Sequence, residues 1–263
     1  MSGLPDNTII PCGGMLGIFR NIGCVGDSLS SGEFEFDNNG ELGYWDCYEY
    51  SWGKMIERLT GVDVTNFSRG GMTAYSIYTE ADEKNSVTES INRLFDKDNA
   101  KQAYIIALGV NDLHNIDMEC YGGNVGGAGD IKEDYRENAN TVIGWYGKII
   151  ARLKEISPHA KFFLLTIPDN GKNEKNAEAF AKALRDTAKK LKNCYIVDLY
   201  KDAPCYCDDF RKAYFNGGHM NAMGYLFTAH YVMRYIDDII RKNHDDFRYV
   251  QFSCSGKKPY LYD

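Results

Sequence analysis

The 263-residue chain lacks any cluster of Lys and Arg side chains, and its formal net charge is −7. A polyphosphate backbone needs a basic footprint, so nucleic acid is not expected as a partner. Long apolar runs are also missing near the N-terminus. The longest uncharged stretch there, residues 7–19, has no basic leader before it and is too short to cross a bilayer. The sequence therefore predicts a cytoplasmic protein with no membrane partner.

The eight cysteines are few for this length and irregularly spaced. Several lie in apolar runs, where a thiol behaves as a small hydrophobic side chain, so buried free thiols are expected. The Cys205-Tyr206-Cys207 pair lacks the second pair of ligands that a closed zinc site needs. Gly-x-x-x-x-Gly-Lys-Ser/Thr is absent, as is Gly-x-Gly-x-x-Gly after a strand, which disfavours a nucleotide- or flavin-binding module. We predict no metal and no cofactor.

The length and the 44% hydrophobic content suffice for one large buried core. We expect a single domain over residues 1–263, with an N-terminal extension (1–18) and a C-terminal tail (244–263). Aromatic residues alternate with polar ones in the tail, at Phe247 and Tyr249, which is typical of an added edge strand or a dimer contact. The sequence leaves the oligomeric state open.

Short runs of β-branched, aromatic and leucine residues alternate along the chain with longer stretches of helical periodicity. The runs predict five strands buried on both faces: 22–25, 62–67, 104–108, 161–167 and 195–199. The helical stretches cover 48–59, 87–95, 135–156, 180–191 and 222–242. Because a right-handed crossover helix returns the chain to the same end of the sheet, this alternation predicts a mostly parallel five-stranded sheet in a three-layer α/β/α sandwich.

Polar residues follow several of the predicted strands. Ser28 comes after the first strand, residues 68–73 after the second, Asn111 after the third, and His219 beyond the fifth. Ligands of such sheets gather at the carboxyl ends of the strands. We therefore expect these residues at one edge of the sheet. A serine hydroxyl becomes a good nucleophile when an adjacent base takes its proton, so Ser28 and His219 suggest a nucleophile and its base.

Four blocks carry a family resemblance: Val25-Gly26-Asp27-Ser28-Leu29-Ser30, Asn66-Phe67-Ser68-Arg69-Gly70-Gly71-Met72-Thr73, Leu108-Gly109-Val110-Asn111-Asp112, and His219-Met220-Asn221-Ala222-Met223-Gly224-Tyr225. In this order they resemble the blocks of the SGNH (GDSL-type) hydrolase superfamily. The resemblance implies a flavodoxin-like topology and an ester hydrolase. It also implies Ser28 as nucleophile, His219 as base, and Gly71, Asn111 and the Ser28 amide as oxyanion-hole donors.

The sequence departs from this family at the third triad position. The family usually has an Asp three residues before the His, where this chain has Asn216. An Asn can orient the imidazole but brings no charge to stabilise the imidazolium. Three readings stay open: a Ser–His dyad oriented by Asn216 or a backbone carbonyl, a substitute carboxylate such as Asp208 or Asp209, or a chain that has lost catalysis.

We expect a serine esterase or acylhydrolase that cleaves a small acyl ester. Tyrosines near the first two blocks could stack on sugar rings, which favours an acylated carbohydrate as substrate: Tyr44, Tyr48, Tyr50, Tyr75 and Tyr78. The alternative is a non-catalytic carbohydrate-binding descendant of the same fold. Asp27 and Asp112 are interpreted as turn or cap residues, and His114 as a solvated loop residue that could reach the cleft. The Gly-rich stretch 121–130 is predicted to be too flexible to pack. We expect it to form either a lid over the cleft or a plain surface loop.

Overall fold

A computed structural model describes residues 14–82, 90–172 and 175–259. Its main sheet has five parallel strands in the order β4-β1-β5-β6-β7. These are β1 (Asn21–Gly26), β4 (Asp63–Ser68), β5 (Ala103–Ala107), β6 (Lys161–Leu165) and β7 (Cys194–Val197). Each one overlaps a strand predicted from the apolar runs. The order is that of flavodoxin-like sheets, so the predicted fold class is confirmed.

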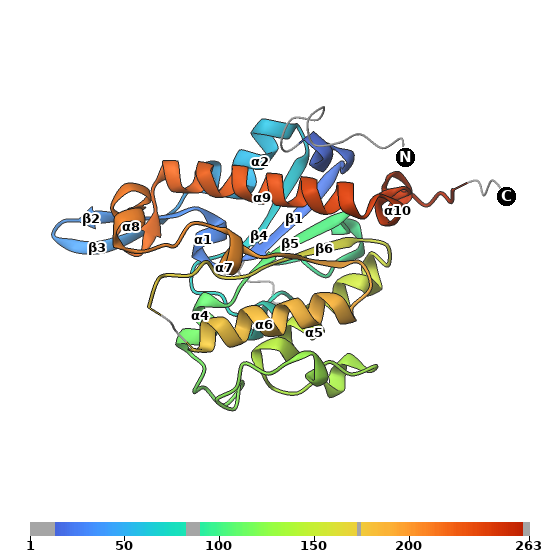
Figure 1. Cartoon of the computed structure of the whole chain (residues 1–263), viewed down its shortest axis with the longest axis horizontal. Coiled ribbons are helices and arrows are strands. Elements are labelled where there is room, and N and C mark those ends of the chain that lie inside the picture. Colours follow the sequence, from blue (N-terminus) through green and yellow to red (C-terminus); the bar gives the residue numbers. More distant parts are fainter. Residues whose placement is uncertain (1–13, 83–89, 173–174, 260–263) are drawn as a thin grey trace.

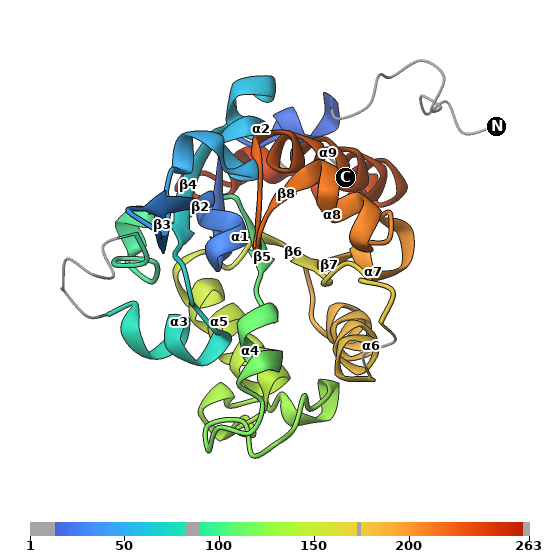
Figure 2. The same cartoon turned by 90° about the vertical axis from the view of Figure 1, so that its left-hand side faces the viewer.

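Helices cover both faces of this sheet (Figures 1 and 2). One face carries α2 (Trp52–Thr60) and α9 (Ala222–Lys242), and the other carries α3 (Ala74–Glu80), α5 (Val142–Ile156) and α6 (Lys175–Lys190). Side chains of a strand alternate between the two faces. In β6, Phe162 and Leu164 enter one core while Phe163 enters the other. This is why the strands read as continuous apolar runs.

Capping side chains decide where the helices begin. Asn221 accepts a hydrogen bond from the Gly224 amide, and α9 follows it over the predicted residues. The predicted helix 135–156 is shorter in the structure, because Thr141 caps the Gly144 amide and α5 starts at Val142. Upstream of that cap, residues 135–137 form only a 3₁₀ turn.

Two other predicted elements differ from the structure. Of the predicted helix 87–95, residues 90–95 form turns, and 87–89 lie outside the described residues. Of the two alternatives for the tail, the edge strand is not formed over residues 244–259, where α10 (His244–Phe247) and a 3₁₀ turn (Val250–Phe252) lie. The reason is aromatic packing. The Phe247 ring is buried and stacks on Phe163, with ring centroids 6.3 Å apart. The dimer contact stays a prediction.

A protruding hairpin was not predicted (Figure 1). It consists of β2 (Glu33–Asn38) and β3 (Glu41–Asp46), paired antiparallel. Asn39 and Gly40 connect them with φ of 58° and 92°, the left-handed backbone that two-residue hairpin turns require. The Asn-Gly pair between alternating residues was the available sequence signal. The hairpin leaves the body of the molecule at the carboxyl end of the main sheet.

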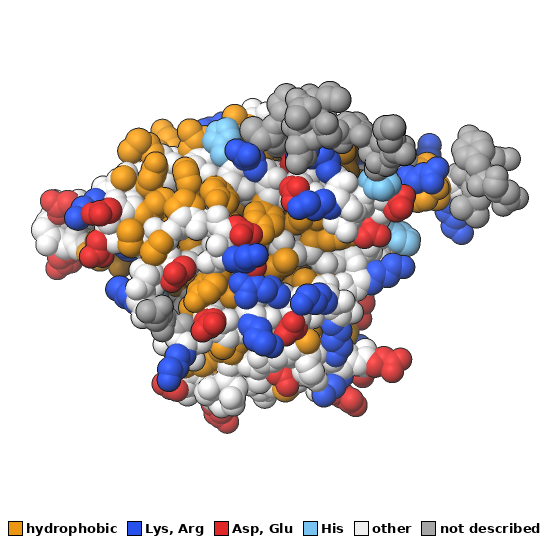
Figure 3. Space-filling view, viewed as in Figure 1, with side chains coloured by type: hydrophobic (Ala, Val, Ile, Leu, Met, Phe, Trp, Pro, Cys, Tyr) orange, Lys and Arg blue, Asp and Glu red, His pale blue; other side chains and the backbone are white. Residues whose placement is uncertain are grey.

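Short elements complete the edge of the sheet from which the hairpin extends. They are α1 (Ser28–Ser31), α4 (Val110–His114), α7 (Leu199–Asp202), α8 (Asp208–Tyr214), and the small hairpin of β8 (Phe215–Asn216) and β9 (His219–Met220). On the face seen in Figure 3, charges of both signs are interspersed, and hydrophobic side chains gather over α8 and the first half of α9. Within the described ranges, no helix has the length and apolar character needed to cross a bilayer.

Candidate active site

Ser28 is the first residue of α1, directly after β1. The preceding residue, Asp27, caps this helix, because its Oδ1 accepts the Leu29 amide at 3.0 Å. Burial raises the pKa of Asp27 to about 7, while the Leu29 amide opposes that rise. Gly26 has no room for a Cβ, which would overlap Ser30 Oγ and approach the Ala107 carbonyl oxygen to 2.9 Å. The predicted turn-forming role of Asp27 is confirmed.

Asn111 and the loop around Gly71 lie next to each other because β4, β1 and β5 are neighbours in the sheet. Asn111 Nδ2 donates to the Met72 carbonyl oxygen at 3.1 Å. Gly71 has φ of 77°, a left-handed conformation that suits a residue without Cβ. Within the described part of the chain, the amides of Ser28 and Gly71 donate to no protein acceptor. Three potential donors therefore stand at the ends of three adjacent strands.

Asp112 fixes the relative position of these loops. Its Oδ1 accepts hydrogen bonds from the Ala74 amide and the Tyr121 hydroxyl, both at 2.9 Å. The side chain is fully buried, and this burial raises its pKa to about 6 against those two hydrogen bonds. Asp112 therefore ties α4 to the start of α3. From the sequence, Asp112 is interpreted as a turn or cap residue; it does bond the first amide of a helix, but of α3, 38 positions away, and not of its own segment.

His219 lies in β9, and both of its ring nitrogens face glutamates from β2. Nδ1 is 2.9 Å from Glu35 Oε1, and Nε2 is 3.0 Å from Glu33 Oε1. A neutral imidazole has only one N–H, so two carboxylate acceptors favour the doubly protonated imidazolium. The Glu33 hydrogen bond raises the pKa of His219 above its usual value; burial opposes this, and Glu35 adds to it.

The β2–β3 hairpin holds these two glutamates on one face, because side chains two residues apart in a strand point the same way. Tyr44, paired with Glu35 across the hairpin, shares that face and lies edge-on to His219, with ring centroids 5.7 Å apart. The base of the hairpin is fixed to α9, since the Tyr225 hydroxyl donates to the Glu33 carbonyl oxygen at 2.7 Å. This cluster was not predicted, although Glu-Phe-Glu-Phe carries the period-2 signal of a strand.

The suggested partners of His219 lie elsewhere. Asn216 is exposed and pairs with His219 only through the β8–β9 backbone. Asp208 and Asp209 are exposed in the first turn of α8, where Asp209 pairs with Lys212. Among the described residues no hydrogen bond joins Ser28 to His219, whose Nε2 faces Glu33 instead.

A cavity of about 470 Å³ lies beside these elements, and its lining includes Asp27, Leu29, Gly218 and Met220 but neither Ser28 nor His219. Successive side chains of a strand point to opposite faces, so His219 faces away from the side on which Met220 lines the cavity. The fold nevertheless brings the segments of Ser28 and His219 together, because α1 contacts β9.

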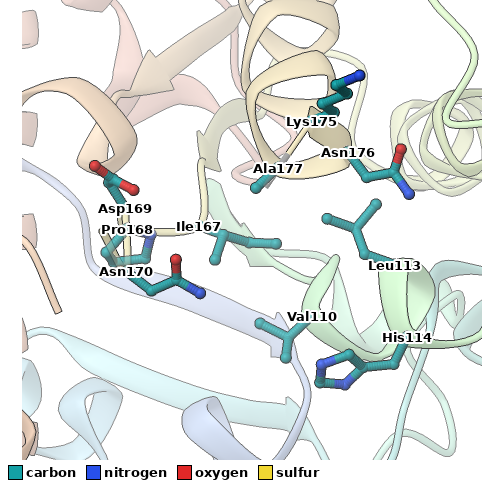
Figure 4. Close-up of a pocket in the computed structure, with 10 residues that line it drawn as sticks. All are labelled: Val110, Leu113, His114, Ile167, Pro168, Asp169, Asn170, Lys175, Asn176 and Ala177. Carbon is teal, nitrogen blue, oxygen red and sulfur yellow. The ribbon is translucent and has the colours of Figure 1, made fainter. Parts of the chain in front are cut away.

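A second cavity, of about 400 Å³, adjoins the first at the ends of β5 and β6. Figure 4 shows its floor of aliphatic side chains, such as Val110 and Ile167, between polar groups on opposite walls. His114, Asn170 and Lys175 are among those polar groups. His114 lines both cavities, so it does reach the cleft.

The Gly-rich stretch 121–130 is packed, contrary to expectation. Tyr121 is fully buried and Val125 is 8% exposed, and the Ile143 amide donates to the Val125 carbonyl oxygen. Asp130 accepts hydrogen bonds from the Gly127 amide and Thr141 Oγ1. No residue of the stretch lines either cavity. It braces the start of α5 instead of covering the cleft.

The expectation of buried thiols holds for only some of the cysteines. Cys24 and Cys194 are buried, whereas Cys205, Cys207 and Cys254 are exposed. Cys12 lies outside the described residues. Within the described ranges no group of three or more His, Cys, Asp or Glu side chains could hold a metal ion.

Comparison with known proteins places this geometry in a family. The model of the GDSL-like Lipase/Acylhydrolase family matches residues 24–226, which include all four sequence blocks. Among curated proteins, none matches the chain.

Solved structures share the fold at low sequence identity. A family two carbohydrate esterase from Clostridium thermocellum, in complex with cellohexaose, has a TM-score of 0.58 at 14% identity; the match covers 84% of this chain and 64% of that one. A possible lipase from Chitinophaga pinensis DSM 2588 has 0.52 at 21%, over 84% and 98% of the two chains. A family 3 carbohydrate esterase from Clostridium thermocellum has 0.51 at 16%, over 85% and 98%.

Proposed function

Because the chain belongs to the GDSL-like lipase/acylhydrolase family, we propose that it hydrolyses small acyl esters with Ser28 as nucleophile and His219 as base. The observation that carries this proposal is the convergence of the predicted residues at one edge of the sheet. Ser28, Gly71 and Asn111 lie at the ends of three adjacent strands, and α1, which begins with Ser28, contacts β9, which contains His219.

The chemistry proceeds in two halves. His219 Nε2 takes the Ser28 proton as Oγ attacks the ester carbonyl carbon, and the tetrahedral intermediate places its negative charge on the former carbonyl oxygen. The amides of Ser28 and Gly71 and the side chain of Asn111 stabilise that charge. Collapse of the intermediate breaks the C–O bond, and the imidazolium protonates the leaving alcohol. Water, deprotonated by His219, then hydrolyses the acyl-enzyme.

An acylated carbohydrate is the substrate class we favour. Tyr44 is 57% exposed beside His219, so a sugar ring could stack on it at the mouth of the site. The other tyrosines considered from the sequence have different positions: Tyr75 and Tyr78 pack on Trp145, and Tyr48 donates to the Val64 carbonyl oxygen. Tyr50 is 43% exposed and lies edge-on to Phe34, so Tyr44 is the tyrosine of this group that contacts His219.

Activity is expected to rise with pH through a pKa above the ordinary histidine value of about 6.5. Only neutral His219 can accept the Ser28 proton, and both glutamates favour its charged form. Glu33→Gln removes one of these charges, which lowers the pKa of His219. The acidic limb of kcat/KM should therefore move to lower pH in that variant. A pH–rate profile of both proteins checks this, and an unmoved acidic limb would contradict the assignment of His219 as base.

A fluorophosphonate probe tests the proposed function. The wild-type protein should be labelled between pH 6 and 9, and Ser28→Ala should not be. Ser31→Ala is the matched control, because Ser31 is buried in the same short helix and its hydroxyl donates to Asp46 Oδ1 at 2.5 Å. A parallel screen of p-nitrophenyl esters, from acetate to octanoate, and of acetylated sugars identifies the acyl group.

One observation favours the alternative, a non-catalytic carbohydrate-binding protein. Glu33 Oε1 lies 3.0 Å from Nε2 of His219, the nitrogen that would have to accept the Ser28 proton. Absence of labelling across this pH range, together with no hydrolysis of any ester in the screen, would support it.

A further inference from the structure

We propose that Glu35 is the positioning residue of His219, supplied by the hairpin that follows the nucleophile and not by the segment that precedes the histidine. The inference rests on the proposed function of Ser28 and His219. The third member of the triad is then Glu35 of β2. It is not Asn216, which stands where the family usually has an Asp.

The contact geometry of Glu35 supports this assignment. Its Oε1 lies 2.9 Å from His219 Nδ1 and accepts the Gly218 amide at 2.7 Å. The carboxylate is thereby bound to both the imidazole and the backbone of the turn that carries it. An added Cβ at Gly217 would overlap Glu35 Oε2, so the carboxylate lies directly against this turn. Only 16% of the Glu35 side chain is exposed.

Glu35 faces the nitrogen that an orienting carboxylate must face. A hydrogen bond from Nδ1–H fixes the tautomer with its lone pair on Nε2, and a negative charge there stabilises the imidazolium that forms during attack. Glu33 cannot have this role, because it binds Nε2, the nitrogen that must receive the Ser28 proton. The two glutamates are therefore not equivalent. Glu35 orients the base, while Glu33 competes with Ser28 for it.

Other charged and titratable groups surround the ring, and they must remain unchanged in the test. Besides Glu35, the groups that act on His219 are Glu33, Asp27 and Asp46, and Tyr44 contacts the ring. Substituting Glu35 by Gln keeps its shape and removes only its charge and one acceptor oxygen. Glu41→Gln is the matched control, because Glu41 is an exposed glutamate of the same hairpin, paired with Asn38.

The experiment measures the imidazole itself as well as turnover. In NMR spectra of the whole chain, with His219→Ala used for assignment, wild type should show a hydrogen-bonded Nδ1 proton on His219. Glu35→Gln should move that signal upfield, because an amide oxygen is a weaker acceptor than a carboxylate, and should lower the pKa at which the ring titrates. In the same variant kcat should fall about tenfold to a hundredfold with little change in KM, because the base remains but is poorly oriented. Glu35→Asp should restore part of the activity, and Glu41→Gln should match wild type.

An unchanged Nδ1 signal and an unchanged titration in Glu35→Gln would overturn the inference, and so would wild-type kcat in that variant. A folding defect is excluded by comparing the urea midpoints of the variants. Failure of the proposed function is distinguishable. If the wild type hydrolyses no ester, the NMR signals of His219 still report whether Glu35 holds the ring.

Discussion

Replacing His219 with Ala is expected to lower kcat for ester hydrolysis by at least about 10⁴-fold, because the proposed function assigns the uptake of the Ser28 proton to this imidazole. The residual rate would come from the oxyanion-hole donors, which this substitution leaves in place. Binding of substrate should change little, since the imidazole contributes mainly to the transition state. Steady-state kinetics with the best ester of the screen measures both quantities.

The control for this variant is His230→Ala. His230 is exposed on the outer side of α9 and should leave kcat and KM unchanged. A loss of less than about tenfold in His219→Ala, with an unchanged urea midpoint, would show that a different group acts as the base.

Asn111→Ala is expected to lower kcat by about 10²–10³, the usual effect of removing one oxyanion-hole donor. The side chain already donates one hydrogen to Met72, which holds it against the Gly71 loop and leaves its second hydrogen for the substrate. KM should stay nearly constant, because the donor acts on charge that develops only in the transition state. Single-turnover kinetics separates this effect from product release.

Losing the Met72 hydrogen bond in the same variant should cost about 1 kcal/mol of unfolding free energy, which urea denaturation measures. Asn243→Ala is the matched control, since Asn243 is exposed at the far end of α9 and its side chain donates only to a helix carbonyl. A turnover number in Asn111→Ala within about threefold of wild type would remove Asn111 from the proposed oxyanion hole.

The sequence predicted the main sheet well, for a physical reason. Strands covered on both faces need apolar residues at every position, and runs such as residues 161–165 have few alternative explanations. The edge where Ser28, Gly71 and Asn111 gather follows from parallel topology alone. Local patterns suffice for these features because each strand is recognised from its own residues, and parallel connections then place the ends of the strands at one edge.

Local sequence patterns could not predict which side chains surround His219. Its contact with Glu35 joins residues 184 positions apart, and nothing within the β8–β9 segment indicates that a distant hairpin supplies a carboxylate. The hairpin itself was detectable from Asn39-Gly40, but its docking against β9 depends on tertiary packing. Likewise, glycines in 121–130 suggested flexibility, while Tyr121 and Val125 anchor that loop in the core.

The position of the hairpin has a consequence for how variants of this protein diverge. One uninterrupted stretch, residues 28–46, contains Ser28, both glutamates that contact His219 and the exposed Tyr44. Under the proposed function, the exchange of this one stretch would change both the pH dependence of hydrolysis and the preference among esters.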